Sequence, residues 1–353
     1  MSAIDRDALW ARLREARLVE GEPPAAVAAR SPWFVRVMLG IAGWIGAVFL
    51  LSFVGVGFAF VMESAAVSFA LGAGVCAGAA LLYRSSPHSD FMNQFGLAVS
   101  LAGQGLMGTA LVRWLEPSMG AAALALAIQQ AALFALVPNF IHRVWTSWTG
   151  AYAVTFALGQ WGLHAFAPAV ATFGFLWPWL AELDHPRRGE MLRAGGYGLA
   201  LAAVQTAVMH GELLGLLWRT GAASVLVLWS GNIASGLVLV WAVLRLRKRE
   251  GVSLGEPHGR IALAGALLLA LISLKAPGVG PATAILVMGY ANGNRVLVGL
   301  GVIALLGYLS HYYYSLHATL LEKSALLAAA GLVLLAARWG LRRWWPAEGV
   351  GHA

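Results

Sequence analysis

The sequence has few charged residues and only one cysteine. Charged residues make up 11% of the 353 positions, against about 25% in soluble domains, while hydrophobic residues make up 59% and the mean hydropathy is +0.73. The lone Cys76 excludes an intramolecular disulfide and a thiolate-rich metal site. This composition excludes an ordinary soluble fold and indicates a polytopic membrane protein.

Several enzyme motifs are also missing. The sequence has no HExxH metalloprotease motif, no Walker phosphate-binding loop and no CxxC pair. No acidic residue lies at the centre of a predicted membrane span, which argues against the carboxylate proton relays of pumps and many coupled carriers. We therefore expect no enzymatic activity, no metal site and no cofactor.

Apolar stretches alternate with short polar breaks, and each is a candidate for a membrane-spanning helix of about 20 residues. The predicted spans are residues 35–60, 64–83, 93–112, 119–137, 144–164, 168–183, 192–211, 221–244, 260–274, 279–293, 295–314 and 319–340. We predict an all-α transmembrane bundle of about twelve spans, as a single membrane domain over residues 31–345. A cytoplasmic segment, residues 1–30, precedes it with a short amphipathic helix over residues 3–19 ended by Glu22-Pro23-Pro24, and a cytoplasmic tail, residues 346–353, follows.

The basic residues predict the orientation of this bundle. If the N-terminus is cytoplasmic, 20 Lys and Arg residues fall on the cytoplasmic side and four fall outside, namely Arg113, Arg219, Lys275 and Lys323. Because cytoplasmic loops carry the excess of Lys and Arg, we place both termini in the cytoplasm. The formal charge of +8 thus reports topology and does not indicate nucleic-acid binding.

Two basic runs, residues 245–249 and 338–345, are expected to contact anionic lipid headgroups at the cytoplasmic leaflet. The residues expected to make these contacts are Arg245, Arg247, Lys248, Arg249, Arg342 and Arg343.

Residues 260–293 are short for two crossings. At about 1.5 Å per residue, 34 residues of helix reach about 51 Å, less than two 30 Å hydrocarbon layers. Tilted or extended helices would leave Lys275 outside, whereas a re-entrant hairpin would place it near the middle of the bilayer. A second turn is expected near residues 310–319, because one helix over 295–340 would be too long for a bilayer.

Polar residues within spans are the candidates for function, because an unpaired polar group is costly in lipid. Each can line a path through the bundle or join two helices. The candidates are Gln94, Gln104, Gln205, Asn232, Lys275, His311, Glu322 and Lys323. Small residues flank Gln104, so it can either hold two closely packed helices together or face a cavity opposite Gln205 and Asn232. Glu322 and Lys323 point about 100° apart on a helix, so each needs its own partner.

Several motifs together resemble an uncharacterised family of bacterial membrane proteins. They are LVEGEP at 18–23, SPWFVR at 31–36, Trp44, NQF at 93–95, AGQ at 102–104, Asn139 with His142-Arg143, YYYSL at 312–316 and LLEKS at 320–324. That family is classed as a domain of unknown function, and its members often accompany a membrane protein with a GDYxxLxY motif. The resemblance implies a multi-pass protein of the bacterial inner membrane and supplies no catalytic residue.

Two functions stay open at this point. In permease-like translocation of a small molecule or a lipid-linked substrate, the polar span residues should converge on one cavity. In a non-transporting scaffold or assembly partner of a co-encoded membrane protein, these residues should be paired between helices, and an apolar flank should carry small residues. The expected partners are membrane lipids and, for the scaffold, that co-encoded protein.

Overall fold

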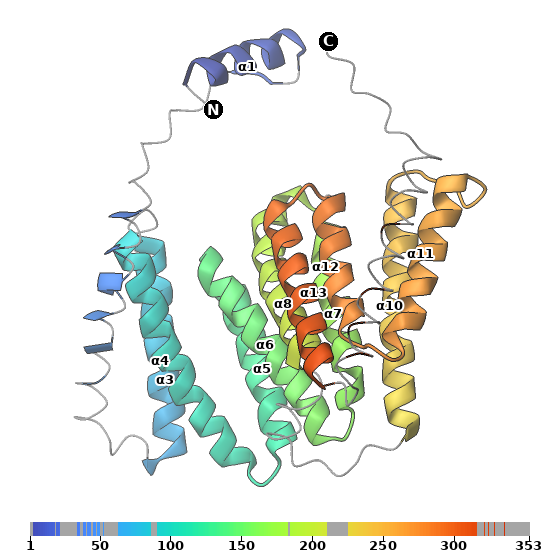
Figure 1. Cartoon of the computed structure of the whole chain (residues 1–353). Coiled ribbons are helices and arrows are strands. Elements are labelled where there is room, and N and C mark those ends of the chain that lie inside the picture. The colour runs from blue at the N-terminus through green and yellow to red at the C-terminus, as the bar shows by residue number, and fades with distance from the viewer. Residues whose placement is uncertain are drawn as a thin grey trace. The chain divides into compact units, whose positions relative to one another are not determined.

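In the computed structural model, all the described secondary structure is helical (Figure 1). The structure describes residues 3–17, 19–21, 63–85, 90–182, 184–209 and 225–315, with isolated positions between 34 and 52 and between 321 and 335. The α-helices are α1 (Ala3–Glu15), α3 (Ala65–Ser85), α4 (Asp90–Leu115), α5 (Met119–Leu136), α6 (Phe140–Gln160), α7 (Ala167–Ala181), α8 (Gly189–Met209), α10 (Val225–Arg249), α11 (Pro257–Ser273), α12 (Val279–Ala291) and α13 (Arg295–Ser315). Two 3₁₀ turns, η2 (His164–Phe166) and η3 (Pro186–Arg188), precede α7 and α8.

Ten of the twelve predicted spans coincide with a described helix, from α3 to α13, with ends that agree within a few residues. Five of these helices, α3, α4, α5, α10 and α13, are long and apolar enough to cross a membrane. The protein is therefore an all-helical membrane protein, and the count of twelve crossings stays a prediction. The first and last predicted spans, residues 35–60 and 319–340, lie mostly outside the described residues.

Helix caps explain where α6 differs from its predicted span. Asn139 precedes the helix, and its side-chain oxygen accepts a hydrogen bond from the His142 backbone N–H at 3.0 Å. Gly162, with φ of +74°, ends the turn after α6. The helix therefore starts four residues before residue 144 and brings His142 inside it.

The N-terminal helix is shorter than predicted. α1 ends at Glu15, ahead of the Glu22-Pro23-Pro24 segment expected to end it. Arg17 adopts φ of +56°, and its N–H donates to the Arg14 carbonyl at 3.0 Å, so the last turn closes through a left-handed residue.

The chain divides into two compact units. The first comprises residues 1–59 and 75–102, and the second comprises residues 60–74 and 103–353. Within the first unit the end of α3 packs on the start of α4. The Cys76 thiol donates to the Ser100 carbonyl at 3.5 Å, and Gly96 lies against the ring of Tyr83.

The core of the second unit lies among α7, α8, α10, α12 and α13. Phe175, Trp179, Leu239, Ile285 and Met288 fill it and are at most 2% exposed. The Trp179 indole meets the Tyr197 ring edge to face, with 5.1 Å between the ring centres. These side chains are buried away from lipid and water, and α12 packs against α7, α8, α10, α11 and α13.

Helices α5 to α8 form a second layer of packing, which contains the largest cavity described below. α6 packs against both α5 and α8, and α8 packs against α7. Gly198 makes the close approach of α6 and α8 possible, because a side chain there would overlap Ser147 and the Val144 carbonyl.

The geometry of α11 and α12 bears on Lys275. The Asn232 side-chain amide donates to the Leu274 carbonyl at 3.0 Å, and the Lys275 ammonium lies 5.4 Å from the ring centre of Trp229. Trp229 is 20 residues, or about 30 Å, from Arg249 along α10. This places Lys275 about one hydrocarbon thickness from Arg249 along α10, and the choice between a crossing and a re-entrant hairpin stays a prediction.

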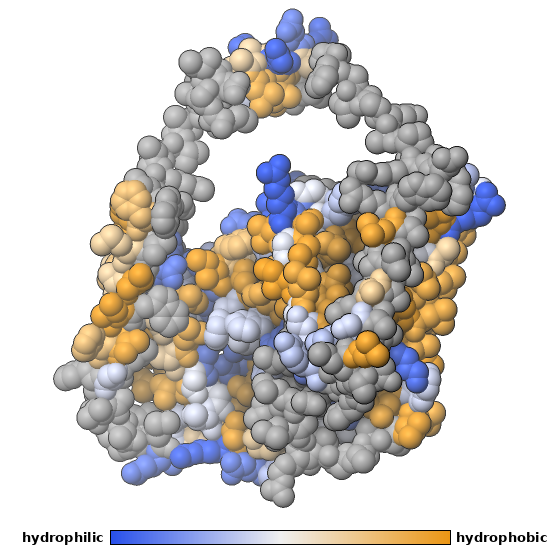
Figure 2. Space-filling model, in the orientation of Figure 1, coloured by the Kyte–Doolittle hydropathy of each residue, from blue (hydrophilic) through white to orange (hydrophobic). Residues whose placement is uncertain are grey.

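Basic residues gather at one end of the second unit, where α5 meets α6, α7 meets α8, α10 meets α11 and α12 meets α13 (Figure 1). We call this the basic end; it carries Arg143, Arg187, Arg188, Arg193, Arg249 and Arg295. Figure 2 shows hydrophobic side chains along the flanks of α10 to α13 between their ends. The exposed apolar residues there include Leu268 and Ile303, as a lipid-facing surface requires.

Candidate functional site

A buried polar cluster joins α4, α5 and α6 in the second unit, with Gln104 at its centre. Gln130 Nε2 donates to Gln104 Oε1 at 3.1 Å, and Gln129 Nε2 donates to the Gln104 carbonyl at 3.4 Å. Gln104 Nε2 lies 3.3 Å from His142 Nε2. All four side chains are buried, so the predicted pairing of Gln104 with a neighbouring helix is part of a four-residue network.

Small residues surround this cluster, as the sequence around Gln104 suggested. Gly72 of α3 lies against the Gly103 carbonyl and Met107, and Gly108 lies against Leu126 of α5. Close helix approach of this kind is typical of membrane helices joined by small and polar residues.

The other candidate residues have different partners. Gln205 Oε1 on α8 accepts a hydrogen bond from Trp148 Nε1 at 2.9 Å. Asn232 on α10 donates to the carbonyl of Leu274, which follows the last residue of α11. Lys275 lies over the Trp229 ring. Gln104, Gln205 and Asn232 therefore lie at three different helix contacts.

The remaining candidates are dispersed. Gln94 lies in the part of α4 that belongs to the first unit, and His311 lies in the last turns of α13. Glu322, Lys323, Arg342 and Arg343 lie outside the described residues. Among the predicted headgroup contacts, Arg245 and Lys248 are exposed, with the Arg245 guanidinium 5.7 Å from the Trp241 ring centre.

Two further arginines of that run bond to the protein. Arg249 Nη1 donates to Asn292 Oδ1 at 2.8 Å, and Arg247 Nη1 donates to the Val252 carbonyl at 2.8 Å. These guanidinium groups hold the α10–α11 and α12–α13 connections, and headgroup contact by the run stays a prediction.

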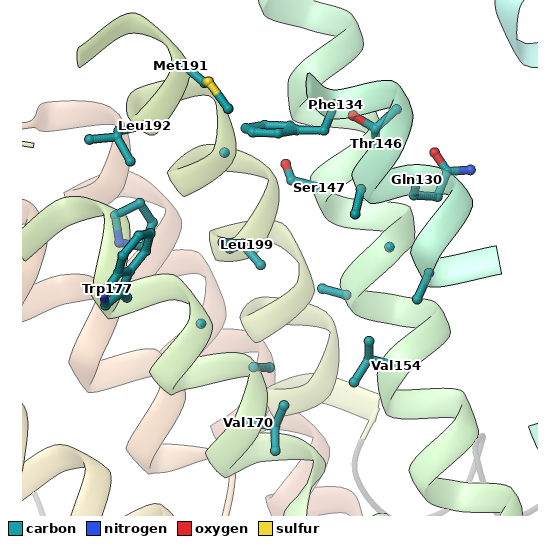
Figure 3. A pocket seen from close by; sticks show the side chains of 18 of the residues that line it. Gln130, Phe134, Thr146, Ser147, Val154, Val170, Trp177, Met191, Leu192 and Leu199 are labelled. Atoms are coloured by element: carbon teal, nitrogen blue, oxygen red, sulfur yellow. The ribbon is translucent and has the colours of Figure 1, made fainter. Parts of the chain in front are cut away.

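A groove of about 480 Å³ lies on the other side of α5 and α6 (Figure 3). α6 and α8 form its floor, and α5 and α7 form its walls, since these two helices share few contacts across it. Small residues line much of it: Ala127, Ala131, Gly150, Ala151, Ala171, Gly174 and Gly195. Val170 and Trp177 on the α7 wall are 41% and 58% exposed, so the groove opens to the surroundings of the described bundle.

The polar groups that line this groove are mostly turned to their own helix. Thr146 donates to the His142 carbonyl at 3.0 Å, Ser147 to the Arg143 carbonyl at 2.8 Å and Thr155 to the Tyr152 carbonyl at 2.8 Å. The one charged residue among those that line the groove is Arg188, at the basic end. The groove is thus an apolar space with a positive charge at one mouth.

None of Gln104, Gln205, Asn232 and Lys275 is among the residues that line the groove. Sequence reasoning therefore missed this site. The available signals were the glycines and alanines repeated on residues 127–131, 150–151 and 171–174, which indicate small faces without saying which of them stay uncovered.

A polar cap at the basic end was also missed. A cavity of about 340 Å³ lies among Trp179, Glu182, Arg193, Tyr197 and residues 292–295. Arg193 pairs with Glu182 at 2.7 Å, and Asn294 Nδ2 donates to the Tyr197 hydroxyl at 2.8 Å. Asn294 Oδ1 also accepts from the Val296 and Leu297 N–H groups and so caps α13.

One catalytic motif is present in the sequence but lacks the local structure that the motif requires. Residues 251–255 read GVSLG and match GxSxG, the nucleophile elbow of hydrolases, which needs a strand-to-helix turn. Here the segment joins two helices, and the Ser253 hydroxyl accepts from the Gly255 N–H at 3.1 Å. This helix-to-helix loop therefore does not have the strand-to-helix turn that exposes the nucleophilic serine in hydrolases.

The sequence comparisons find one family. The model of a domain of unknown function, DUF4401, matches residues 32–344. No curated protein and no solved structure matches the chain.

Proposed function

The chain belongs to the DUF4401 family, a domain of unknown function, and from this premise we propose that it is a non-transporting membrane scaffold or assembly partner of a co-encoded membrane protein. In this proposal the chain is a multi-pass protein of the bacterial inner membrane, with about twelve spans and both termini in the cytoplasm. It has no enzymatic activity of its own.

The observation that carries the proposal is the pairing of the polar span residues. Gln104, Gln205 and Asn232 each bond across a helix–helix contact, and none lines the groove among α5 to α8. A path for a polar solute needs polar groups that face the path, because its walls must replace the water around the solute. Here the polar groups join helices, and the cavity is apolar.

The alternative of translocating a lipid-linked substrate finds weaker support. A headgroup that crosses the bilayer along the groove would need polar partners along its length. Beyond Arg188, the groove offers Gln130, whose amide donates to Gln104. It also offers Thr146, Ser147 and Thr155, whose hydroxyls donate to carbonyls of α6. The arrangement therefore favours a scaffold, in which a packed bundle binds hydrophobic partners, rather than a carrier.

Thiol accessibility tests the proposal. In a Cys76→Ala background, single cysteines replace Gln205, Asn232 and Lys275, and a membrane-impermeant thiol reagent is applied to right-side-out and inside-out vesicles. We expect protection of the cysteines at Gln205 and Asn232 from both sides, and labelling of the cysteine at Lys275 from one side only. Labelling of both paired positions, Gln205 and Asn232, in variants that elute as folded protein, would indicate a water-filled path and would refute the scaffold.

A further inference from the structure

The groove among α5, α6, α7 and α8 has the depth of one leaflet. Its floor runs about 14 Å along α6, from Thr146 to Thr155, and about 12 Å along α8, and its α7 wall runs about 12 Å. Half of a hydrocarbon layer is about 15 Å. A partner helix that spans the membrane would need a surface about twice as long.

The groove also starts at a defined depth. Phe134, Trp177, Arg188 and Met191 border it at the basic end, and Ala127, Thr155, Val170 and Leu199 border it at the deep end. The exposed Trp177 indole lies near the basic end, at the depth that tryptophan prefers in membrane proteins. The groove therefore reaches from the headgroup level toward the middle of the bilayer.

The charge at its mouth is positive. Arg188 is exposed and lines the groove, and Arg187 precedes it on the same 3₁₀ turn. A guanidinium group binds phosphate oxygens with two parallel hydrogen bonds. The mouth thus suits the phosphodiester of a lipid headgroup, and the apolar groove below it suits an acyl chain.

From the depth, the volume and this charge, we propose that the groove binds one anionic phospholipid of the leaflet at the basic end, with an acyl chain between α5 and α7 and the phosphate at Arg188. A volume of about 480 Å³ lies within the range of about 300–1,000 Å³ that small-molecule sites occupy. This inference does not depend on the scaffold proposal.

The energetics assign different roles to the two parts of the site. An acyl chain is already in hydrocarbon, so the groove provides shape and close contact but little hydrophobic gain. Selectivity for a negative headgroup therefore comes from Arg188. We expect its removal to weaken binding about fivefold, as estimated for one basic residue near an anionic surface.

Photo-crosslinking tests the site directly. The full chain is placed in phosphatidylcholine nanodiscs that contain a small share of phosphatidylglycerol with a photoreactive diazirine in one acyl chain. Adducts are then mapped by mass spectrometry of peptides. We expect adducts on residues 127–134 and 146–155. We expect fewer adducts when the same diazirine-labelled acyl chain is attached to a phosphatidylcholine headgroup.

Two variants and two matched controls sharpen the test. Gly174→Leu fills the groove, since a Cβ there meets only the Leu199 side chain at 3.6 Å, and it should abolish the groove adducts. Arg188→Gln should lower them about fivefold. The controls are Gly265→Leu, at an exposed glycine of α11 with open space around it, and Arg260→Gln, at an exposed arginine of α11.

The outcomes distinguish a specific lipid-binding site from non-specific contact with the surrounding lipids. Groove adducts that fall in Gly174→Leu and Arg188→Gln but persist in both controls support the proposal. If Gly174→Leu, folded by its unfolding curve, leaves the groove adducts unchanged, the proposal is wrong. Equal losses in Arg188→Gln and Arg260→Gln would show a general charge effect and would also overturn it.

Discussion

The two sides of the α5–α6 pair differ in what fills the space beside them. On one side, Gln129, Gln130 and His142 meet Gln104 in a buried polar cluster. On the other side, Ala131 and Gly150 line a groove that is open and apolar. Gln130 borders both, with its amide in the cluster and its 8% exposure showing how little of it reaches the groove.

This difference shows how the bundle distributes polarity. Polar side chains lie where helices touch, and the space that helices leave between them is lined by small apolar residues. A water-filled path would require the reverse arrangement, because water in a cavity needs polar partners. Four substitutions test this contrast, from the largest expected effect to the smallest, by equilibrium unfolding of the full chain in detergent with sodium dodecyl sulfate as the denaturant.

The largest effect is expected from adding a side chain to the closed contact between α6 and α8. Gly198→Leu should lower the free energy of unfolding by about 3 kcal/mol, because its side chain would overlap Ser147 and separate α6 from α8. Gly174→Leu, on the open wall, should change it by less than about 0.5 kcal/mol. Equal costs for the two variants would show that the groove is closed.

Removal of the hub of the polar cluster comes next. Gln104→Leu should lower the free energy of unfolding by about 2 kcal/mol, because the Gln130 amide loses its acceptor Gln104 Oε1 and the His142 ring loses its contact with Gln104 Nε2. Thr109→Val on the same helix is the control, since the Thr109 hydroxyl bonds only to the Leu106 carbonyl of its own helix. A loss for Gln104→Leu no larger than that for Thr109→Val would contradict the cluster.

The polar cap at the basic end should contribute less. Asn294→Ala is expected to cost about 1.5 kcal/mol, because it removes the cap of α13 and the hydrogen bond to Tyr197. Asn294→Asp keeps the capping oxygen and loses the donor, so its cost should be smaller. The interpretation fails if the aspartate variant is the less stable of the two.

A single bond outside the cluster should have the smallest effect. Trp148→Phe removes the hydrogen bond to Gln205 and should cost about 0.6 kcal/mol, the average for such bonds between membrane helices. The exposed Trp177→Phe is the control and should leave the unfolding curve unchanged. A cost for Trp148→Phe above about 2 kcal/mol would mean that Gln205 belongs to a larger network.

The sequence predicted the helices well because the bilayer imposes their length and apolarity. The predicted spans 119–137 and 295–314 agree with α5 and α13 to within one residue at each end. α1 was less predictable, because the left-handed turn at Arg17 has no sequence signal as strong as a glycine or proline. In the region 310–319, where a turn was expected, the chain stays helical as far as Ser315, and residues 316–319 lie outside the described residues.

The site could be predicted only in part. Small residues beside Gln104 indicate that another helix can approach closely there. Its partners on α5 and α6 depend on which faces meet, and a single sequence does not contain this information. The same limit hid the groove: alanines and glycines line packed contacts and open walls alike. Gly198 and Gly174 differ only in what surrounds them.

The central claim is that the groove contains lipid and no water, and spin-label accessibility measures this directly. In a Cys76→Ala background, a nitroxide at Val170 reports the deep end of the groove, with labels at the exposed Leu268 of α11 and at Glu256 in the α10–α11 loop as lipid and water references. The account predicts that oxygen relaxes the Val170 label as strongly as the Leu268 label, while a water-soluble nickel chelate does not reach it. Relaxation by nickel at Val170 comparable to that at Glu256 would show a water-filled path and contradict the account.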